Sequence, residues 1–322
     1  MTSAITGKHF DDMPALAPLR KRLGELASRN IFVGTSSWKY EGWLGRLYSP
    51  ERYEYRGKIA KTRFEAECLS EYAETFRTVC VDAGFYRFPE EKYISNLASQ
   101  VPDGFLLSFK ATDEITIKHF PNQQRHGERA GKPNENFLNA ELFADSFLGP
   151  MSPYREKIGV IMFEFSRFYS SDFERGRHFV AALDVFLGRL PKGWQFGVEL
   201  RNPGFLQPDY FAMLRNHGVT HVFNAWTQMP TVSEQIALEG SFTADFFASR
   251  FLLRKGRAYQ AAVEAFSPYS EVKDVNPEAR DAIKSLAQRS SKRPSSIFVN
   301  NRLEGNALKT ISEALVNGDE LS

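Results

Sequence analysis

The chain has little cysteine, no long apolar run and almost no net charge, and each shortage excludes a class of protein. Only two cysteines occur in 322 residues. They cannot form the disulfide framework of a small secreted domain, so we expect a cytoplasmic protein. No run approaches the ~20 apolar residues that span a bilayer, and we expect no membrane association. The formal net charge is only +2, so no global basic field predicts nucleic-acid binding.

Several short catalytic motifs are also missing. The sequence contains no Gly-x-Ser-x-Gly elbow and no Gly-x-x-x-x-Gly-Lys-Ser/Thr loop, which argues against triad-type acyl transfer and Walker-type nucleotide hydrolysis. No glycine-rich dinucleotide fingerprint follows the first predicted strand, which disfavours a doubly wound open sheet. The six histidines form no His-Glu-x-x-His motif and no zinc spacing.

Short apolar runs rich in Val, Ile and Phe alternate with segments of helical spacing along the whole chain. Eight runs are predicted as strands, over residues 31–35, 78–82, 105–110, 158–163, 196–200, 220–224, 251–254 and 296–300. The intervening helices are predicted over 63–76, 90–100, 136–147, 171–190, 208–216, 277–289 and 304–316, with a shorter one over 16–29 before the first strand. This alternation predicts an α/β protein, a (β/α)8 TIM-barrel-like single domain over 31–317, preceded by an N-terminal extension over 1–30.

The predicted connections are unequal. Links from a helix to the next strand are short, whereas the links from strand to helix over 36–61, 111–135, 225–241 and 255–276 are long. In this fold the loops at the C-terminal face of the strands build the functional site. The sequence therefore places its extra length on that face.

The segment from Val198 to Pro203 is a strand end with charged residues. Successive side chains of a strand point to opposite faces, so Glu199 and Arg201 share one face. A carboxylate and a guanidinium at a strand end suit a ligand pocket, although a structural ion pair closing the strand explains them too. We predict Glu199 as a general acid or base and Arg201 as a substrate-binding residue.

The other strand ends carry polar side chains of the same kind, which we expect to converge on one mouth. Lys110 is predicted to act with Glu199 in catalysis, and the predicted substrate-binding positions are Asp82, Glu164, Asn224, Arg254 and Asn300. Because buried charges need partners, this set favours a small anionic or polyhydroxy ligand. Carboxylates are also the ligands that Mg²⁺ or Mn²⁺ prefers, but the neighbouring cations neutralise them. We predict no metal and no cofactor, and Mg²⁺ or Mn²⁺ stays as the alternative.

Two of the long loops have distinctive compositions. The loop over 38–61 mixes aromatic rings, Trp38 among them, with Arg and Lys. Such rings either stack on a ligand or pack the loop onto the barrel rim, and nucleic acid is only weakly indicated. The loop over 111–135 is long enough to form a lid, and its His119 is a candidate proton donor or acceptor, if it is not merely exposed.

The same residues resemble the YecE-like family, catalogued as domain of unknown function 72, from about Ile31 to Leu315. The similar elements are Gly34-Thr35-Ser36, Tyr48-Ser49-Pro50, Phe85-Tyr86-Arg87-Phe88-Pro89, Lys110, Val198-Glu199-Leu200-Arg201, Arg254-Lys255-Gly256-Arg257 and Phe298-Val299-Asn300-Asn301. The resemblance implies a TIM-barrel-like fold and no settled activity. It adds Tyr86 to the candidate substrate-binding residues.

The chain departs from the family pattern at two strand ends. Members usually carry Glu-x-Asn where this chain has Cys80-Val81-Asp82, and Gln-x-Pro-Pro where it has Glu164-Phe165-Ser166-Arg167. If these positions contact the ligand, the resemblance implies a substrate or mechanism that differs from that of typical members.

Three functional classes remain open on the sequence. The favoured one is an enzyme that acts on a small anionic or polyhydroxy compound by acid/base chemistry at the strand ends. The alternatives are a non-catalytic ligand-binding or interaction module, and a phosphodiesterase- or nuclease-like barrel. We expect a small anionic molecule as partner, and the sequence does not indicate an oligomeric state.

Overall fold

Eight parallel strands close into a barrel in the computed structural model, which describes residues 16–82 and 87–316. The strands are β1 (Ile31–Thr35), β4 (Thr78–Val81), β5 (Leu106–Lys110), β6 (Ile158–Phe165), β7 (Gln195–Leu200), β8 (Thr220–Ala225), β9 (Ala248–Phe251) and β10 (Ser295–Val299). Each barrel strand pairs with the next in the chain, and β10 pairs with β1. The predicted TIM-barrel-like fold is confirmed.

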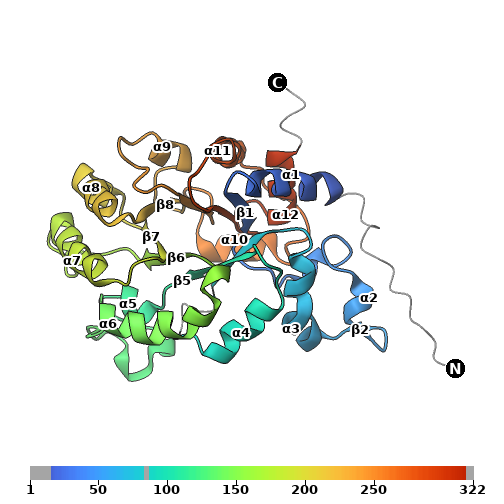
Figure 1. Ribbon diagram of the computed structural model, residues 1–322, viewed down its shortest axis with the longest axis horizontal. Helices are drawn as coiled ribbons and strands as arrows, with labels where there is room; N and C mark the ends of the chain where they lie inside the picture. Colours follow the sequence, from blue (N-terminus) through green and yellow to red (C-terminus); the bar gives the residue numbers. More distant parts are fainter. Residues whose placement is uncertain (1–15, 83–86, 317–322) are drawn as a thin grey trace.

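Helices surround the barrel. They are α1 (Ala17–Ala27), α3 (Lys61–Tyr72), α4 (Glu91–Ser99), α6 (Ala140–Phe143), α7 (Gly176–Arg189), α8 (Pro208–His217), α9 (Val232–Ile236), α11 (Pro277–Ala287) and α12 (Ala307–Leu315). In Figure 1, α7 and α8 lie on the opposite side of the barrel from α2 (Pro50–Tyr53) and α3. None of the helices in the described ranges is long and apolar enough to cross a bilayer.

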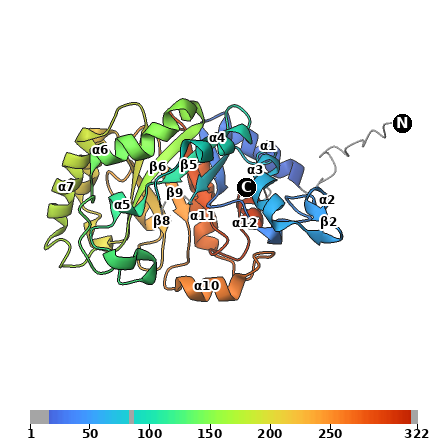
Figure 2. The same ribbon diagram turned by 90° about the horizontal axis from the view of Figure 1, so that it is seen from below.

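The long loops after the strands carry short elements of their own. The first loop holds α2 and a hairpin of β2 (Glu54–Tyr55) with β3 (Lys58–Ile59), the loop after β5 holds α5 (Asp113–Thr116), and the loop after β9 holds α10 (Tyr259–Phe266). Figure 2 shows α10 standing apart from the ring of helices. This asymmetry agrees with the unequal loop lengths predicted from the sequence.

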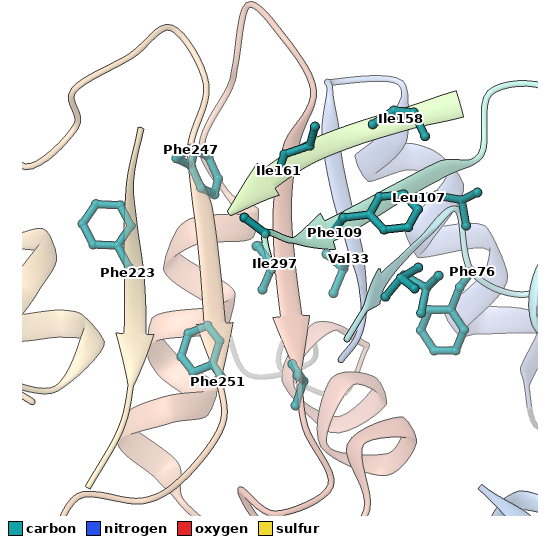
Figure 3. Packing of buried hydrophobic residues seen from close by; sticks show 14 of the residues in the cluster. Val33, Phe76, Leu107, Phe109, Ile158, Ile161, Phe223, Phe247, Phe251 and Ile297 are labelled. Atoms are coloured by element: carbon teal, nitrogen blue, oxygen red, sulfur yellow. The ribbon is translucent and has the colours of Figure 1, made fainter. Parts of the chain in front are cut away.

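The barrel strands are apolar on both faces, because the outer face packs on helices and the inner face fills the barrel. Side chains such as Phe223, Phe251 and Ile297 belong to the outer core (Figure 3). A separate inner cluster includes Cys80, Met162 and Phe298 among its members. The inner face also holds hydroxyls lower in the barrel, such as those of Thr78, Thr220 and Ser296, but on the described strands its charged side chains lie toward the C-terminal ends, where the site is.

Gly34 allows β1 to approach β4 closely where the barrel closes. A Cβ at this position would lie 2.1 Å from the carbonyl oxygen of Thr78, a distance that real Cβ atoms do not adopt. The two strands pair in parallel through Thr35 and Val79. Glycine is therefore required for close backbone approach here, not for an unusual backbone angle.

The predicted position of strand β9 was wrong. The structure places β9 at Ala248–Phe251, whereas the sequence indicated 251–254. The apolar run Phe251-Leu252-Leu253 gave the strand signal, but the backbone amides of Leu252 and Leu253 turn to the carbonyl of Ala225 after the strand has ended. The true strand contains Arg250, whose charge is compensated only by residues from distant strands.

The other seven predicted strands lie within two residues of those observed. The predicted helices over 136–147 and 171–190 begin later, at Ala140 and Gly176. In the first of these, a π-helical turn over Ala144–Leu148 continues α6. The preceding residues belong to the loops that form the site.

Candidate functional site

Two carboxylates lie side by side at the C-terminal ends of β6 and β7. The pairing of these strands sets Glu164 opposite Glu199. Both follow the inner face, which is occupied lower down by Val160 and Met162. Two like charges at this spacing require cations between them.

Arg250 of β9 supplies the central cation. Its Nη1 donates to Glu164 Oε2 at 2.6 Å and to Glu199 Oε2 at 2.8 Å, and its Nη2 donates to Asp82 Oδ1 at 3.2 Å. Burial alone would lower the pKa of Arg250, but the carboxylates of Glu199, Asp82 and Glu164 outweigh burial and raise it well above its ordinary value. Arg250 is therefore a permanent charge at the centre of the barrel.

Two further cations flank the pair of carboxylates. Lys110 Nζ lies 3.0 Å from Glu164 Oε2. Arg201 Nη2 lies 3.3 Å from Glu164 Oε2 and 2.5 Å from Glu199 Oε1, and its Nη1 donates to Asn224 Oδ1 at 3.1 Å. We call Asp82, Lys110, Glu164, Glu199, Arg201 and Arg250 the mouth cluster; it balances three carboxylates with three cations.

The two central carboxylates differ in access. The Glu199 side chain is fully buried, whereas 13% of the Glu164 side chain is exposed and lines a cavity. Burial raises the pKa of Glu164, but Lys110, Arg201 and Arg250 together hold it well below the usual range. Glu164 is thus an ionised acceptor that a ligand can reach, and Glu199 holds two of the cations from beneath.

The cavity has a volume of about 580 Å³ and lies between the loops that follow β5 and β6. Its walls combine cations, hydroxyls and aromatic rings. The side chains that line it include Lys118, His119, Phe120, Glu164, Ser166, Arg167, Phe168, Tyr169, Ser171 and Asp172. Such a mixture suits a ligand with hydroxyls and a negative charge.

A histidine–aspartate pair joins the two walls. His119 Nδ1 lies 2.6 Å from Asp172 Oδ1, and Asp172 Oδ2 accepts from the backbone amide of Tyr169 at 2.8 Å. Lys118 Nζ donates to the backbone carbonyl of Asp172 and lies 3.7 Å from the centre of the Phe173 ring. The contact with Asp172 occupies Nδ1 of His119, so Nε2 is the ring nitrogen that remains for another partner.

Comparison with known proteins agrees with this geometry at the level of the fold. The sequence profile of a family described as protein of unknown function DUF72 matches residues 32–316. The chain belongs to the DUF72 family. A comparison with curated proteins gives no match.

Solved structures of other DUF72 proteins have the same fold. A member from Enterococcus faecalis superposes with a TM-score of 0.59 at 18% identity, covering 91% of this chain and 96% of that one. A member from Thermotoga maritima gives a TM-score of 0.57 at 21% identity, covering 90% of this chain and 98% of that one. At these identities the likeness establishes the fold alone.

The structure of this DUF72 protein brings together most of the residues predicted from the sequence. Asp82, Lys110, Glu164, Glu199 and Arg201 form direct ion pairs within the mouth cluster, and Asn224 is bonded to it through Arg201. His119 faces the same cavity as Glu164 from the loop over 111–135. The catalytic and binding roles assigned to these residues stay predictions.

Arg254 is placed differently from what the sequence indicated. It follows β9, its side chain is 40% exposed, and its Nη1 bonds both carboxylate oxygens of Asp274 at 2.8 and 2.9 Å. The expected position at the end of β9 was wrong because that strand ends at Phe251. Arg250, four residues earlier and within β9, holds the place in the mouth cluster.

Three other candidates lie outside the mouth cluster or beyond the described residues. Asn300 is buried and accepts from the backbone amide of Arg302 at 2.9 Å. Trp38 is buried in the core, and its carbonyl accepts from the Tyr48 hydroxyl. Tyr86 falls within 83–86, outside the described residues.

Sequence reasoning missed Arg250, Arg167 and Asp172. The charge of Arg250 hid its strand, although its spacing of two residues from Ala248 places both on the inner face. Asp172 gave no signal, because its partner His119 is 53 residues away in the chain. Nowhere in 16–82 and 87–316 do three His, Cys, Asp or Glu side chains form a group that could hold a metal ion.

Proposed function

We propose that this DUF72 protein is an enzyme that binds a small anionic or polyhydroxy compound above Glu164 and acts on it by acid/base chemistry. The observation that carries the proposal is Glu164 itself. This carboxylate is anchored by three cations on one side and faces a cavity of about 580 Å³ on the other. A purely structural ion pair does not need such an opening.

The cavity offers complementary groups for both parts of such a ligand. Because its pKa is low, ionised Glu164 accepts hydrogen bonds from hydroxyl groups. Lys118 and Arg167 on the walls offer charged donors to a phosphate or carboxylate, and hydrogen bonds between ionised groups are about twice as strong as neutral ones. The cavity is thus proposed as an anion-binding pocket.

His119 is the proposed group that gives or takes the proton. Asp172 fixes its Nδ1, as the orienting carboxylate does for other catalytic histidines, and so directs Nε2 to its task. Lys110 and Glu199 act around Glu164: Lys110 contacts it directly, and Glu199 fixes Arg201 and Arg250. The two cysteines are free and buried, and we place the protein in the reducing cytoplasm.

The first experiment identifies the ligand and locates its site. Mass spectrometry of the natively purified protein reports what is retained, and thermal unfolding with ribose 5-phosphate tests a probe with hydroxyls and a phosphate. We expect this probe to stabilise the wild type and to bind Glu164→Gln at least about tenfold more weakly. No retained small molecule and no stabilisation by any sugar phosphate would contradict the proposal.

The second experiment separates catalysis from binding. For the turnover found with the identified ligand, His119→Asn should lower kcat by about a hundredfold or more while the affinity stays within a few fold. His217→Asn is the matched control, since His217 Nε2 also lies 2.6 Å from a carboxylate, that of Asp184, away from the cavity. Equal activity of the His119 and His217 variants would exclude His119 as the group that gives or takes the proton.

A further inference from the structure

A second, smaller cavity lies between the loops that follow β8 and β9. Its volume is about 230 Å³, and its lining combines apolar side chains, among them Trp226, Met229, Pro230 and Leu253, with polar ones such as Arg254, Lys255 and Glu278. Trp226 is half-buried and also packs against a small core under α10, formed by Leu253, Ala262 and Phe266.

Arg201 lies between the two cavities. Its Nη2 is 3.3 Å from Glu164, which lines the first cavity, and its guanidinium carbon is 4.0 Å from the centre of the Trp226 ring, which lines the second. One side chain therefore spans the distance from the ionised carboxylate to the indole.

The rims of the two cavities are also joined. Arg167, from the wall of the first cavity, donates to Gln228 Oε1 at 2.7 Å. Gln228 lies in the chain between Trp226 and Met229, both of which line the second cavity. The bond ties the loop after β6 to the loop after β8.

The cations of the second cavity already have anionic partners. Arg254 pairs with Asp274, which Arg257 also contacts, and Lys255 lies 3.5 Å from Glu234. Burial raises the pKa of Asp274, but Arg257 and Arg254 lower it further than burial raises it, so that pair stays charged. A tryptophan-lined pocket whose cations are already paired suits a flat ring better than a second anion.

We infer that the Trp226 cavity binds a planar ring that is covalently joined to the polar part of the ligand in the Glu164 cavity, as the base is joined to the sugar phosphate in a nucleotide. This inference rests on the proposed function for the polar half. The stacking of a ring on an aromatic side chain adds roughly 1–3 kcal/mol per base, which corresponds to an affinity gain of about five- to 150-fold.

Three matched probes test the inference by calorimetry: ribose 5-phosphate, adenine, and adenosine 5′-monophosphate, which joins the two. We expect the wild type to bind the joined probe at least about tenfold more tightly than ribose 5-phosphate. Trp226→Ala should remove that gain and leave the affinity for ribose 5-phosphate unchanged, whereas Trp226→Phe should retain most of it. Trp194→Ala is the control, because Trp194 also stacks with an arginine, Arg155 at 4.9 Å, but lines neither cavity.

The outcomes separate the inference from the proposed function. Equal affinities of ribose 5-phosphate and the joined probe overturn the ring site while the proposed function stands. If ribose 5-phosphate does not bind but adenine binds and loses affinity in Trp226→Ala, the polar half of the proposal fails and the ring site stands. Saturation-transfer NMR on the wild type needs no variant. The adenine protons of the joined probe must receive saturation from the protein, and the absence of saturation on these protons overturns the inference.

Discussion

Two clusters of carboxylates and guanidinium groups within residues 16–82 and 87–316 are built differently. The mouth cluster joins residues of five barrel strands or strand ends. The other, which we call the Glu304 cluster, consists of Arg280, Glu304, Thr310 and Glu313, and it ties α11 to α12 and to the loop between β10 and α12. Glu304 is fully buried, and it accepts from Arg280 Nη2 at 2.7 Å and from Thr310 Oγ1 at 2.8 Å.

The difference lies in what the carboxylate oxygens face. Both oxygens of Glu304 are taken up by protein donors, including the backbone amide of Asn276 at 2.6 Å, and Glu304 lines neither cavity. Glu164 lines the larger cavity, and Arg250 Nε, deep in the same cluster, has no hydrogen-bond partner among the described residues. Burial and pairing are common to both clusters, so access from a cavity is the feature that indicates function.

The strongest test of the comparison removes the central cation of the mouth cluster. Arg250→Met leaves Glu164, Glu199 and Asp82 without their shared partner, and breaking a buried pair in this way costs about 3–5 kcal/mol of unfolding free energy. Urea denaturation at pH 7 measures it. Arg280→Met is the matched change in the Glu304 cluster, and we expect a smaller loss because Arg280 is partly exposed. A loss below 1 kcal/mol for Arg250→Met would contradict the central role of its charge.

The unfolding free energy depends on pH through the buried His221 as well as through the carboxylates, so the contribution of His221 must be measured on its own. Burial lowers the pKa of His221 to about 4, against the opposing effect of its hydrogen bond to Gln235. In the unfolded chain His221 becomes protonated near pH 6.5, whereas in the folded chain it becomes protonated only near pH 4. Roughly 3 kcal/mol of unfolding free energy is therefore lost as the pH falls from 6.5 to 4. In His221→Gln this part of the pH dependence should vanish, as followed by urea denaturation at pH 7, 5.5 and 4.

Glu164 contributes to stability in a lower pH range. Its folded pKa lies well below that of the unfolded chain, so its stabilisation is complete above the unfolded value of about 4.3 and is lost as the pH falls below it. Glu164→Gln should cost about 1.5–3 kcal/mol at pH 7, since hydrogen bonds to a charged group are lost, and its stability should fall less steeply below pH 4.3. An acid limb identical to that of the wild type would show that Glu164 is not the ionised group we describe.

The smallest change in stability is expected at the rim. Arg167 is exposed and bonds Gln228 across the two cavities, so Arg167→Ala should alter the unfolding free energy by less than about 0.5 kcal/mol. The same change removes a cation from the proposed anion site, and the affinity for ribose 5-phosphate should fall about tenfold. Arg155→Ala, remote from the cavity, should affect neither quantity. An unaltered affinity in Arg167→Ala would remove this residue from the site.

The fold was predictable because its signals are local. Runs such as those of β1 and β8 are apolar and bounded by polar turns, so the strand alternation follows from neighbouring residues alone. The inward register of Glu164, Glu199 and Arg201 followed from the alternation of side chains along a strand. These features need no knowledge of distant segments.

The site was only partly predictable because its decisive contacts are long-range. Arg250 is stable inside the barrel only through carboxylates 51, 86 and 168 residues away in the chain, so its strand does not look like one in isolation. The pairing of His119 with Asp172 likewise joins two loops that no periodic pattern connects. The distinction between reachable Glu164 and buried Glu199 depends on how those loops pack, which the sequence pattern does not encode.

The pairing of β1 with β10 has a consequence for chain connectivity. Five consecutive register pairs, from Ile31 with Ser295 to Thr35 with Val299, join the first and last barrel strands, and α1 contacts α12. The order in which the strands are covalently linked is therefore separable from the order in which they hydrogen-bond. A circularly permuted chain, with a linker from α12 to α1 and new ends in the turn before β7, keeps every barrel pairing and both cavities, because these depend on the closed ring and not on where the polypeptide starts.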